Sequence, residues 1–162
     1  MTCQPCHLDI HSNNVLYNGE RIYLIDWELS SNCDPYVDLA FASMFFVFDK
    51  EKEKAFLDSY FQATPTAKQE AKFFLLKQVT LCLYSFRLLR RLCGIGKMDL
   101  SQEHDILKAL PNYRDFILEN YNGCAKNFTN DDLKLFPFMF LNEVRKNLQS
   151  PEFKESLNIM SK

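Results

Sequence analysis

The chain has 162 residues, which is enough for one compact domain with a hydrophobic core. Its formal net charge is −2 at pH 7, and a general nucleic-acid-binding domain would need a basic excess. No uninterrupted apolar run has the length of a membrane span, and the first residues carry neither the basic nor the apolar region of a signal peptide. We therefore expect a cytoplasmic protein with reduced cysteines and no membrane partner.

The first forty residues are predicted to contain two loops and a β-hairpin. Residues 1–14 and 29–36 are rich in polar and turn-forming types, which indicates loops. The Asn-Gly pair at residues 18–19 separates two runs of β-prone residues and favours a type I′ turn, in which both central residues have φ > 0. This hairpin would bring Asn14, at the start of the first strand, beside Asp26, at the end of the second.

The rest of the chain is predicted to be helical. Thr66 is suited to cap the longest helix, which Gly94 and Gly96 end. The polar segment from Pro151 onward is either a short last helix or a frayed tail. The fold class is therefore α+β and predominantly helical. The predicted helices cover residues 37–48, 50–61, 67–93, 101–120 and 130–149.

Asp9, Asn14 and Asp26 have the residue types and the spacing of a phosphoryl-transfer site. The reaction needs a carboxylate that orients the attacking hydroxyl and accepts its proton. It also needs oxygen ligands for the Mg²⁺ that neutralises the phosphates. Asp9 lies on a loop, Asn14 follows five residues later, and Asp26 comes after the hairpin. Asp9 is the candidate for the first role, and Asn14 and Asp26 are candidates for the second.

Three linked blocks of sequence carry a resemblance to a known family. They are HLDIHSNNVL at residues 7–16, IDWE at residues 25–28 and DPYVDLA at residues 34–40. Together they resemble the C-terminal lobe of the aminoglycoside phosphotransferase and choline kinase superfamily, whose members share the protein-kinase-like fold. The family pattern often has Pro-Gly before its metal-binding Asn, where this chain has Ser12-Asn13, and Asn tolerates a left-handed backbone well.

The resemblance implies roles for individual residues. Asp9 corresponds to the catalytic base, and Asn14 and Asp26 to the Mg²⁺ ligands. His7 corresponds to a histidine that braces the catalytic loop, and Asp38 to an aspartate that anchors this loop by hydrogen bonds. The implied cofactors are ATP and Mg²⁺.

Three further residues near the motif are candidates for supporting or substrate-binding roles. The Asp-Trp-Glu order at residues 26–28 is similar to the choline, ethanolamine and thiamine kinase branch, in which an acidic residue near Glu28 helps to hold a cationic acceptor. Glu28 is a candidate for this contact or for a salt bridge, and Trp27 for a substrate contact or a core position. His11 either lines the phosphate site or caps the loop, and we favour the structural role.

The domain organisation implied by the resemblance is a kinase-like C-terminal lobe over residues 1–150, with a tail at 151–162. The lobe would divide into a catalytic and metal-binding segment, residues 1–40, and a helical acceptor-binding subdomain, residues 41–150. We expect the family's N-terminal lobe to be absent, because the sequence starts only six residues before His7. We therefore expect this chain alone to be inactive and to bind Mg²⁺–ATP weakly or not at all. The surface left by the missing N-lobe is a candidate for homodimer formation.

The function expected from the resemblance is ATP-dependent phosphorylation of the hydroxyl of a small amine. Choline and ethanolamine are the first candidates for this amino-alcohol substrate, and thiamine and aminoglycosides come next. The alternative is a non-catalytic truncated kinase lobe that acts as a binding or dimerisation module.

Other interpretations of the same residues remain open. Cys3, Cys6 and His7 match the spacing of a c-type haem attachment site, and with His11 they could form a tetrahedral zinc site. The simpler interpretation is a loop thiol and a small buried hydrophobic residue. Several aromatic residues could form a cage for a cation, but a plain hydrophobic core is the simpler interpretation. His104 is expected at the surface. The aromatic candidates are Tyr60, Tyr84, Phe86 and Tyr113.

Overall fold

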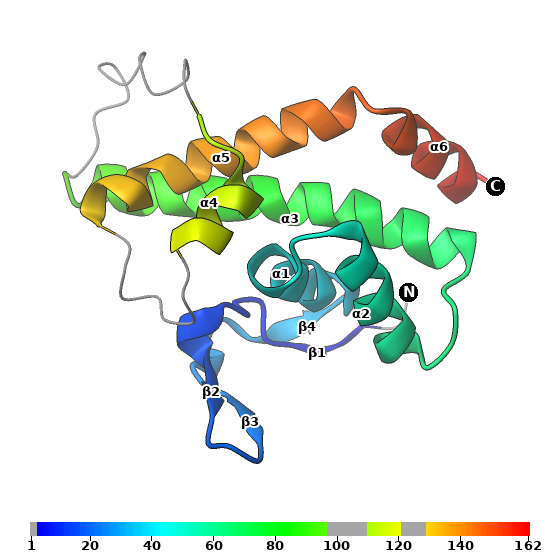
Figure 1. The fold of residues 1–162 in the computed structure, drawn as a ribbon, viewed down its shortest axis with the longest axis horizontal. Helices are drawn as coiled ribbons and strands as arrows, with labels where there is room; N and C mark the ends of the chain where they lie inside the picture. Colours follow the sequence, from blue (N-terminus) through cyan, green and yellow to red (C-terminus); the bar gives the residue numbers. More distant parts are fainter. Residues whose placement is uncertain (1–2, 97–109, 121–128) are drawn as a thin grey trace. The chain divides into compact units, whose positions relative to one another are not determined.

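The computed structural model describes residues 3–96, 110–120 and 129–162. It has the predicted class, because the described residues are mostly helical and add two small antiparallel sheets. The chain divides into two compact units, Met1–Lys77 with Glu155–Lys162, and Gln78–Lys154. Helix α3 (Ala67–Gly94) is one continuous helix (Figure 1). The boundary falls within it, so its first part belongs to one unit and its second part to the other.

In the first unit, a short two-stranded sheet joins the segments on either side of the hairpin. Strand β1 (Gln4–Cys6) pairs antiparallel with β4 (Ser31–Cys33), with Gln4 opposite Cys33. The sequence predicted loops here, and this prediction was wrong for both strands. Each strand is only three residues long, Gln-Pro-Cys and Ser-Asn-Cys, and is too short to show the apolar–polar alternation that predicts strands.

The predicted β-hairpin is present as β2 (Val15–Tyr17) and β3 (Ile22–Leu24). Its turn differs from the expected type I′ turn at residues 18–19. Asn18 N–H donates to the Arg21 carbonyl at 3.3 Å, so the central residues are Gly19, with φ 98°, and Glu20. The reason is local, because the Asn18 side-chain oxygen accepts from the backbone N–H groups of Glu20 and Arg21.

Helices α1 (Tyr36–Phe46) and α2 (Lys50–Phe61) follow, within two residues of the predicted bounds. Asp49 caps α2 by accepting from Lys52 N–H at 2.7 Å. Both helices pack with the first part of α3 around a small apolar core. Its buried members are Tyr36, Leu39, Leu57 and Phe73.

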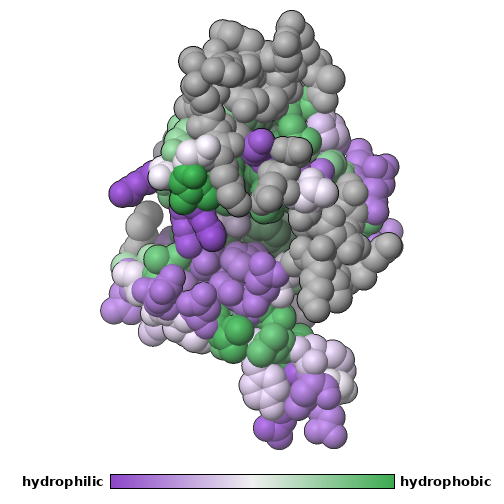
Figure 2. Space-filling model, turned by 90° about the vertical axis from the view of Figure 1, so that its left-hand side faces the viewer, coloured by the Kyte–Doolittle hydropathy of each residue, from purple (hydrophilic) through white to green (hydrophobic). Residues whose placement is uncertain are grey.

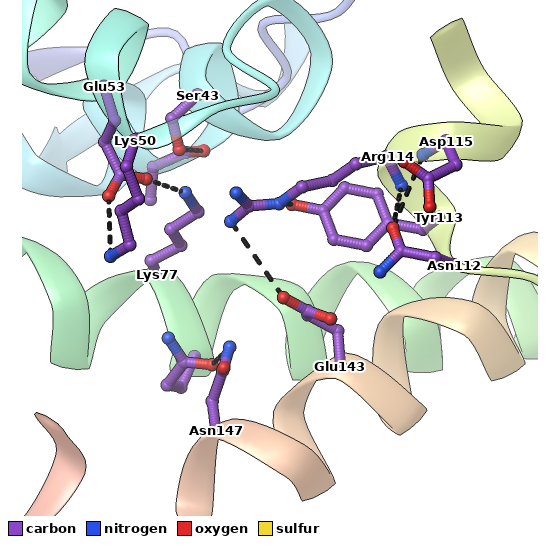
Figure 3. Close-up of polar contacts among 12 residues, drawn as sticks. Ser43, Lys50, Glu53, Lys77, Asn112, Tyr113, Arg114, Asp115, Glu143 and Asn147 are labelled. Carbon is purple, nitrogen blue, oxygen red and sulfur yellow. Dashed lines mark hydrogen bonds and ion pairs between the residues drawn. The ribbon is translucent and has the colours of Figure 1, made fainter. Parts of the chain in front are cut away.

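A buried ion pair links α2 to α3 inside the first unit. Lys77 has only 3% of its surface exposed, and its ammonium group contacts the carboxylate of Glu53 (Figure 3). Lys50 lies 3.3 Å from the other Glu53 oxygen. The Lys77 ammonium also lies 5.4 Å from the ring centre of Phe73, which adds a cation–π contact.

The second unit contains the rest of α3, α4 (Tyr113–Asn120) and α5 (Asn130–Leu148). The helix predicted over 101–120 falls partly outside the described residues. A capping box between Thr129 and Asp132 begins α5. Tyr113 and Phe140 are fully buried with ring centres 5.2 Å apart, as expected of a plain core.

The segment after Pro151 is a helix, α6 (Pro151–Met160), which settles the open choice between a helix and a frayed tail. Among the described residues, no helix combines the length and the apolar character that crossing a membrane requires. Residues 155–162 belong to the first unit, which also holds all eight candidate site residues.

Candidate active site

The loop that carries Asp9 is anchored through its backbone to α1. The carboxylate of Asp38 accepts two hydrogen bonds, from His7 N–H at 2.7 Å and from Leu8 N–H at 2.8 Å. Leu8 has a φ of 63°, a left-handed conformation that is unfavourable for a non-glycine residue. The two bonds to one carboxylate hold the backbone in this conformation immediately before Asp9.

The His7 side chain ties the same loop to the end of the hairpin. Its ring is 1% exposed, and Nε2 lies 2.8 Å from the carbonyl oxygen of Ile25. A carbonyl only accepts, so Nε2 carries a proton and donates. The ring centre of Trp27 lies 4.7 Å from that of His7, and the Trp27 indole N–H donates to the Leu24 carbonyl at 2.9 Å. His7 is therefore held between the loop and the residues around Asp26.

Asp9 and Asn14 are buried and in contact. Asn14 Nδ2 donates to the backbone carbonyl of Asp9 at 3.0 Å and lies 3.5 Å from Asp9 Oδ2. The carbonyl acceptor fixes the orientation of the amide, because only its NH₂ group can donate. The Asn14 side-chain oxygen is therefore the atom of this amide that remains to bind a cation.

The hairpin brings Asp26 to the position next to Asn14. Ile25 N–H donates to the Asn14 carbonyl at 3.0 Å, which extends the strand pairing by one residue beyond Val15 and Leu24. Asp26 then takes a left-handed conformation with φ 66° and ψ 61°. It precedes the short 3-10 helix Trp27–Leu29 but makes no capping bond with its side chain. Its exposed carboxylate is therefore not used to hold the backbone.

These residues fit a magnesium ion. Mg²⁺ prefers oxygen ligands, and it is commonly held by one or two carboxylates together with substrate phosphates. The amide oxygen of Asn14 and the carboxylate of Asp26 are such ligands, and neither group accepts a hydrogen bond from another of the described residues. The bonded Asn14–Ile25 backbone pair places both residues at one end of the hairpin.

His11 lies between the loop backbone and Asp9. Its Nδ1 accepts from Asn13 N–H at 3.2 Å and caps the 3-10 turn Ser12–Asn14. Its Nε2 lies 3.6 Å from Asp9 Oδ2. Asn13 does not adopt the left-handed conformation that its position in the motif suggested, because the capped turn is right-handed.

The two candidate substrate-binding residues are exposed. Trp27 has 49% of its surface accessible, with part of its ring against His7. Glu28 is exposed and forms no salt bridge within the part of the chain that the structure describes. Of the two roles considered for Glu28, the salt bridge is therefore not seen among these residues.

The hairpin beside the site carries apolar side chains that remain accessible. They gather on the strands and on the turn after Asp26, and Figure 2 shows hydrophobic atoms where the hairpin leaves the rest of the unit. The side chains with at least 40% exposure are Leu16, Tyr17, Ile22, Tyr23, Ile25 and Trp27.

The haem and zinc interpretations gain no support from the structure. Among the described residues, which include Cys3, Cys6, His7 and His11, no group of three or more His, Cys, Asp or Glu side chains could hold a metal ion. The Cys6 thiol instead donates to the Cys33 carbonyl at 3.6 Å, and none of the described cysteines forms a disulfide. Burial raises the pKa of the Cys33 thiol to about 12, and a hydrogen bond with Cys6 adds to this shift.

The proposed aromatic cage residues are divided between the units. Tyr60 lies on α2 in the first unit, whereas Tyr84, Phe86 and Tyr113 belong to the second. Tyr113 is buried and Phe86 is 61% exposed. His104, which was expected at the surface, lies outside the described residues.

Two residues of the site could not be found from the sequence. Leu8 is noticeable only through its left-handed backbone, and a leucine gives no indication of this in a sequence. Ile25 contributes its backbone carbonyl to His7 and its N–H to Asn14, and backbone groups leave no pattern in residue types.

Comparison with known proteins finds a family model that matches the segment carrying this geometry. The model of the phosphotransferase enzyme family, APH, matches residues 4–74, which contain every residue of the candidate site. The chain is 34% identical over 61 residues to Protein LicA of Haemophilus influenzae, covering 38% of this chain and 23% of that protein. It is 28% identical over 111 residues to an uncharacterized protein of Metamycoplasma hominis, covering 68% of this chain and 21% of the relative.

A solved structure has the same fold. The choline/ethanolamine kinase family protein from Mesorhizobium loti aligns with a TM-score of 0.69 and 19% identity, over 99% of this chain and 44% of that one. The chain thus spans less than half of this structure and about a fifth of the curated relatives. The family model and the fold confirm the resemblance to the kinase-like superfamily.

Proposed function

We propose that this chain forms the catalytic part of a small-molecule kinase, which transfers phosphate from ATP to the hydroxyl of a small amine. The observation that carries the proposal is the arrangement of Asp9, Asn14 and Asp26. The Asp38 carboxylate anchors the loop before Asp9, Asn14 holds the Asp9 backbone, and the Asn14–Ile25 pair brings Asp26 beside them. The expected acceptors are choline or ethanolamine, followed by thiamine and aminoglycosides.

In this proposal Asp9 orients the acceptor hydroxyl and takes its proton as the oxygen attacks phosphorus. Its burial beside Asn14 keeps the carboxylate in one place, so less orientation has to be gained when the acceptor binds. Asn14 and Asp26 would hold Mg²⁺ through their side-chain oxygens. A bound Mg²⁺ supplies positive charge that neutralises the phosphates during transfer.

The acceptor class is supported by two exposed groups beside Asp26. Glu28 offers a negative charge with no salt bridge among the described residues, and Trp27 offers an accessible indole ring. A carboxylate attracts a cationic amine, and an aromatic face holds one through a cation–π contact. The name of the structural neighbour, a choline/ethanolamine kinase family protein, agrees with this ordering of acceptors. A cytoplasmic location, where ATP is available, is part of the proposal.

An acceptor panel tests this function. The native gene product, isolated from its source cells rather than produced as this chain alone, is incubated with ATP, Mg²⁺ and each candidate amine, and phosphorylated products are identified by mass spectrometry. We expect one amino alcohol to be phosphorylated, and we expect the product to disappear when EDTA removes Mg²⁺. The Glu20→Gln variant, altered at the exposed hairpin turn, serves as a control that keeps full activity. Absence of product with every acceptor would contradict the proposal.

A second candidate function is a binding or dimerisation module without catalysis. The exposed apolar side chains of β2 and β3 favour it, because large accessible apolar groups often mark contact surfaces. Analytical ultracentrifugation, together with the acceptor panel, distinguishes the catalytic from the non-catalytic function. A stable homodimer that transfers no phosphate would favour the module, whereas phosphate transfer excludes a purely non-catalytic role.

A further inference from the structure

We propose that His11 is a positioning residue for Asp9, in addition to capping the loop. The inference rests on the proposed function, because positioning matters only if Asp9 acts on a hydroxyl. One imidazole ring would then have two separate tasks. Nδ1 holds the backbone turn, and Nε2 faces the carboxylate.

The cap determines which nitrogen of His11 carries the proton. Nδ1 accepts from Asn13 N–H at 3.2 Å, so in the neutral ring Nδ1 has no proton and Nε2 has one. Nε2 lies 3.6 Å from Asp9 Oδ2, so this ring nitrogen presents a donor to a carboxylate oxygen. The distance is longer than a hydrogen bond, and contacts of this kind shorten in catalytic sites when substrate binds.

The surroundings restrict movement of the ring. The ring of Phe45 lies edge-on, with centres 5.9 Å apart and an angle of 69° between the planes. Only 20% of the His11 side chain and 10% of the Asp9 side chain are exposed. The ring is thus limited by the cap on one side and by an aromatic neighbour on another, so Nε2 stays close to Asp9.

His11 and Asn14 act on the same oxygen of Asp9. Asn14 Nδ2 lies 3.5 Å from Asp9 Oδ2, the atom that His11 Nε2 also approaches. A carboxylate rotates easily about its last torsion, so its two oxygens can exchange places. Two donors that approach one oxygen make the two oxygens different and favour one plane of the group. A fixed plane favours transfer of the hydroxyl proton along a single direction.

Two substitutions separate the cap from the contact with Asp9. In His11→Asn, the amide oxygen takes the place of Nδ1 and keeps the cap, but the side chain is too short to reach Asp9. In His11→Gln, the amide nitrogen reaches the position of Nε2, but the residue is a poorer cap. Each variant is measured for its urea midpoint and for kcat and KM in the native protein, with Asp9→Ala as the inactive reference.

We expect one variant to lose kcat without losing stability, and the other to lose stability without losing kcat. His11→Asn should keep the urea midpoint and lose kcat by about 10- to 100-fold, with KM unchanged. His11→Gln should unfold at lower urea and keep kcat within about threefold. A kcat that follows stability, or that changes in neither variant, overturns the positioning role. A wild-type protein without turnover overturns the proposed function, and this inference with it.

Discussion

The carboxylate of Asp38 accepts from the backbone N–H of Leu8 at 2.8 Å, at a residue whose φ is 63°. A left-handed leucine costs free energy, and such conformations persist only where the surrounding structure holds them. Here the second carboxylate oxygen also accepts, from His7 N–H at 2.7 Å. The loop that carries Asp9 is therefore kept in a strained conformation by one side chain of α1.

Replacing Asp38 by Asn should destabilise the protein. The Asn side chain has one acceptor oxygen, so its NH₂ group would face one of the two backbone N–H groups without a bond. We expect a loss of about 1–3 kcal/mol in the free energy of unfolding, measured by urea denaturation. Glu20→Gln removes the same charge from an exposed turn and should change the value by less than about 0.5 kcal/mol. An equal effect in both variants would show that Asp38 does not anchor the loop.

The buried ion pair of the first unit gives a second prediction. Lys77→Met should destabilise the protein by about 1–4 kcal/mol, because the Glu53 carboxylate would lose its buried counterion (Figure 3). Changing Glu53 to Met as well should recover part of the loss, since no carboxylate then remains. Lys54→Met, which removes an exposed pair with Asp58, is the control and should cost less than about 1 kcal/mol. Thermal and urea unfolding both report these differences, and a harmless Lys77→Met would contradict the account.

The Cys33 thiol gives a prediction about pH. Its pKa is raised from 9.0 to about 12, first by burial and then by its hydrogen bond with Cys6. A raised folded-state pKa contributes stability below pH 9, and this contribution is lost as the pH rises from 9 toward 12. At pH 8 the thiolate is scarce, so alkylation of Cys33 should be on the order of 100-fold slower than that of exposed Cys3 and Cys93.

Peptide mapping after timed treatment with iodoacetamide measures this difference. The same reaction in urea is the control, because all cysteines should then react at similar rates. Alkylation of Cys33 in the folded protein as fast as that of Cys93 would contradict the raised pKa.

The hairpin could be predicted because its information is local. Asn18 and Gly19 are typical turn residues between β-prone runs, and the structure has both strands. The register of the turn could not be predicted, because it depends on which backbone groups the Asn18 side chain accepts from. The β1–β4 sheet was missed because its strands are three residues long and pair across an intervening hairpin.

The candidate site could be predicted as a set of residue types but not as a set of contacts. The hairpin already predicted that Asn14 and Asp26 lie close together, and the spacing of Asp9 and Asn14 indicated the type of site. The bonds from Asp38 to the loop could be stated only through the family resemblance. The left-handed Leu8 and the capping geometry of His11 required the structure, because many residue types could occupy those positions.

The central claim is that Asp9 acts on the acceptor hydroxyl while other groups hold the nucleotide. The most direct test compares Asp9→Ala with the wild-type native protein, measuring kcat with the acceptor from the panel and nucleotide affinity by calorimetry. We predict a kcat at least about 100-fold lower, with nucleotide affinity unchanged within about twofold. An unchanged kcat in Asp9→Ala would contradict the account.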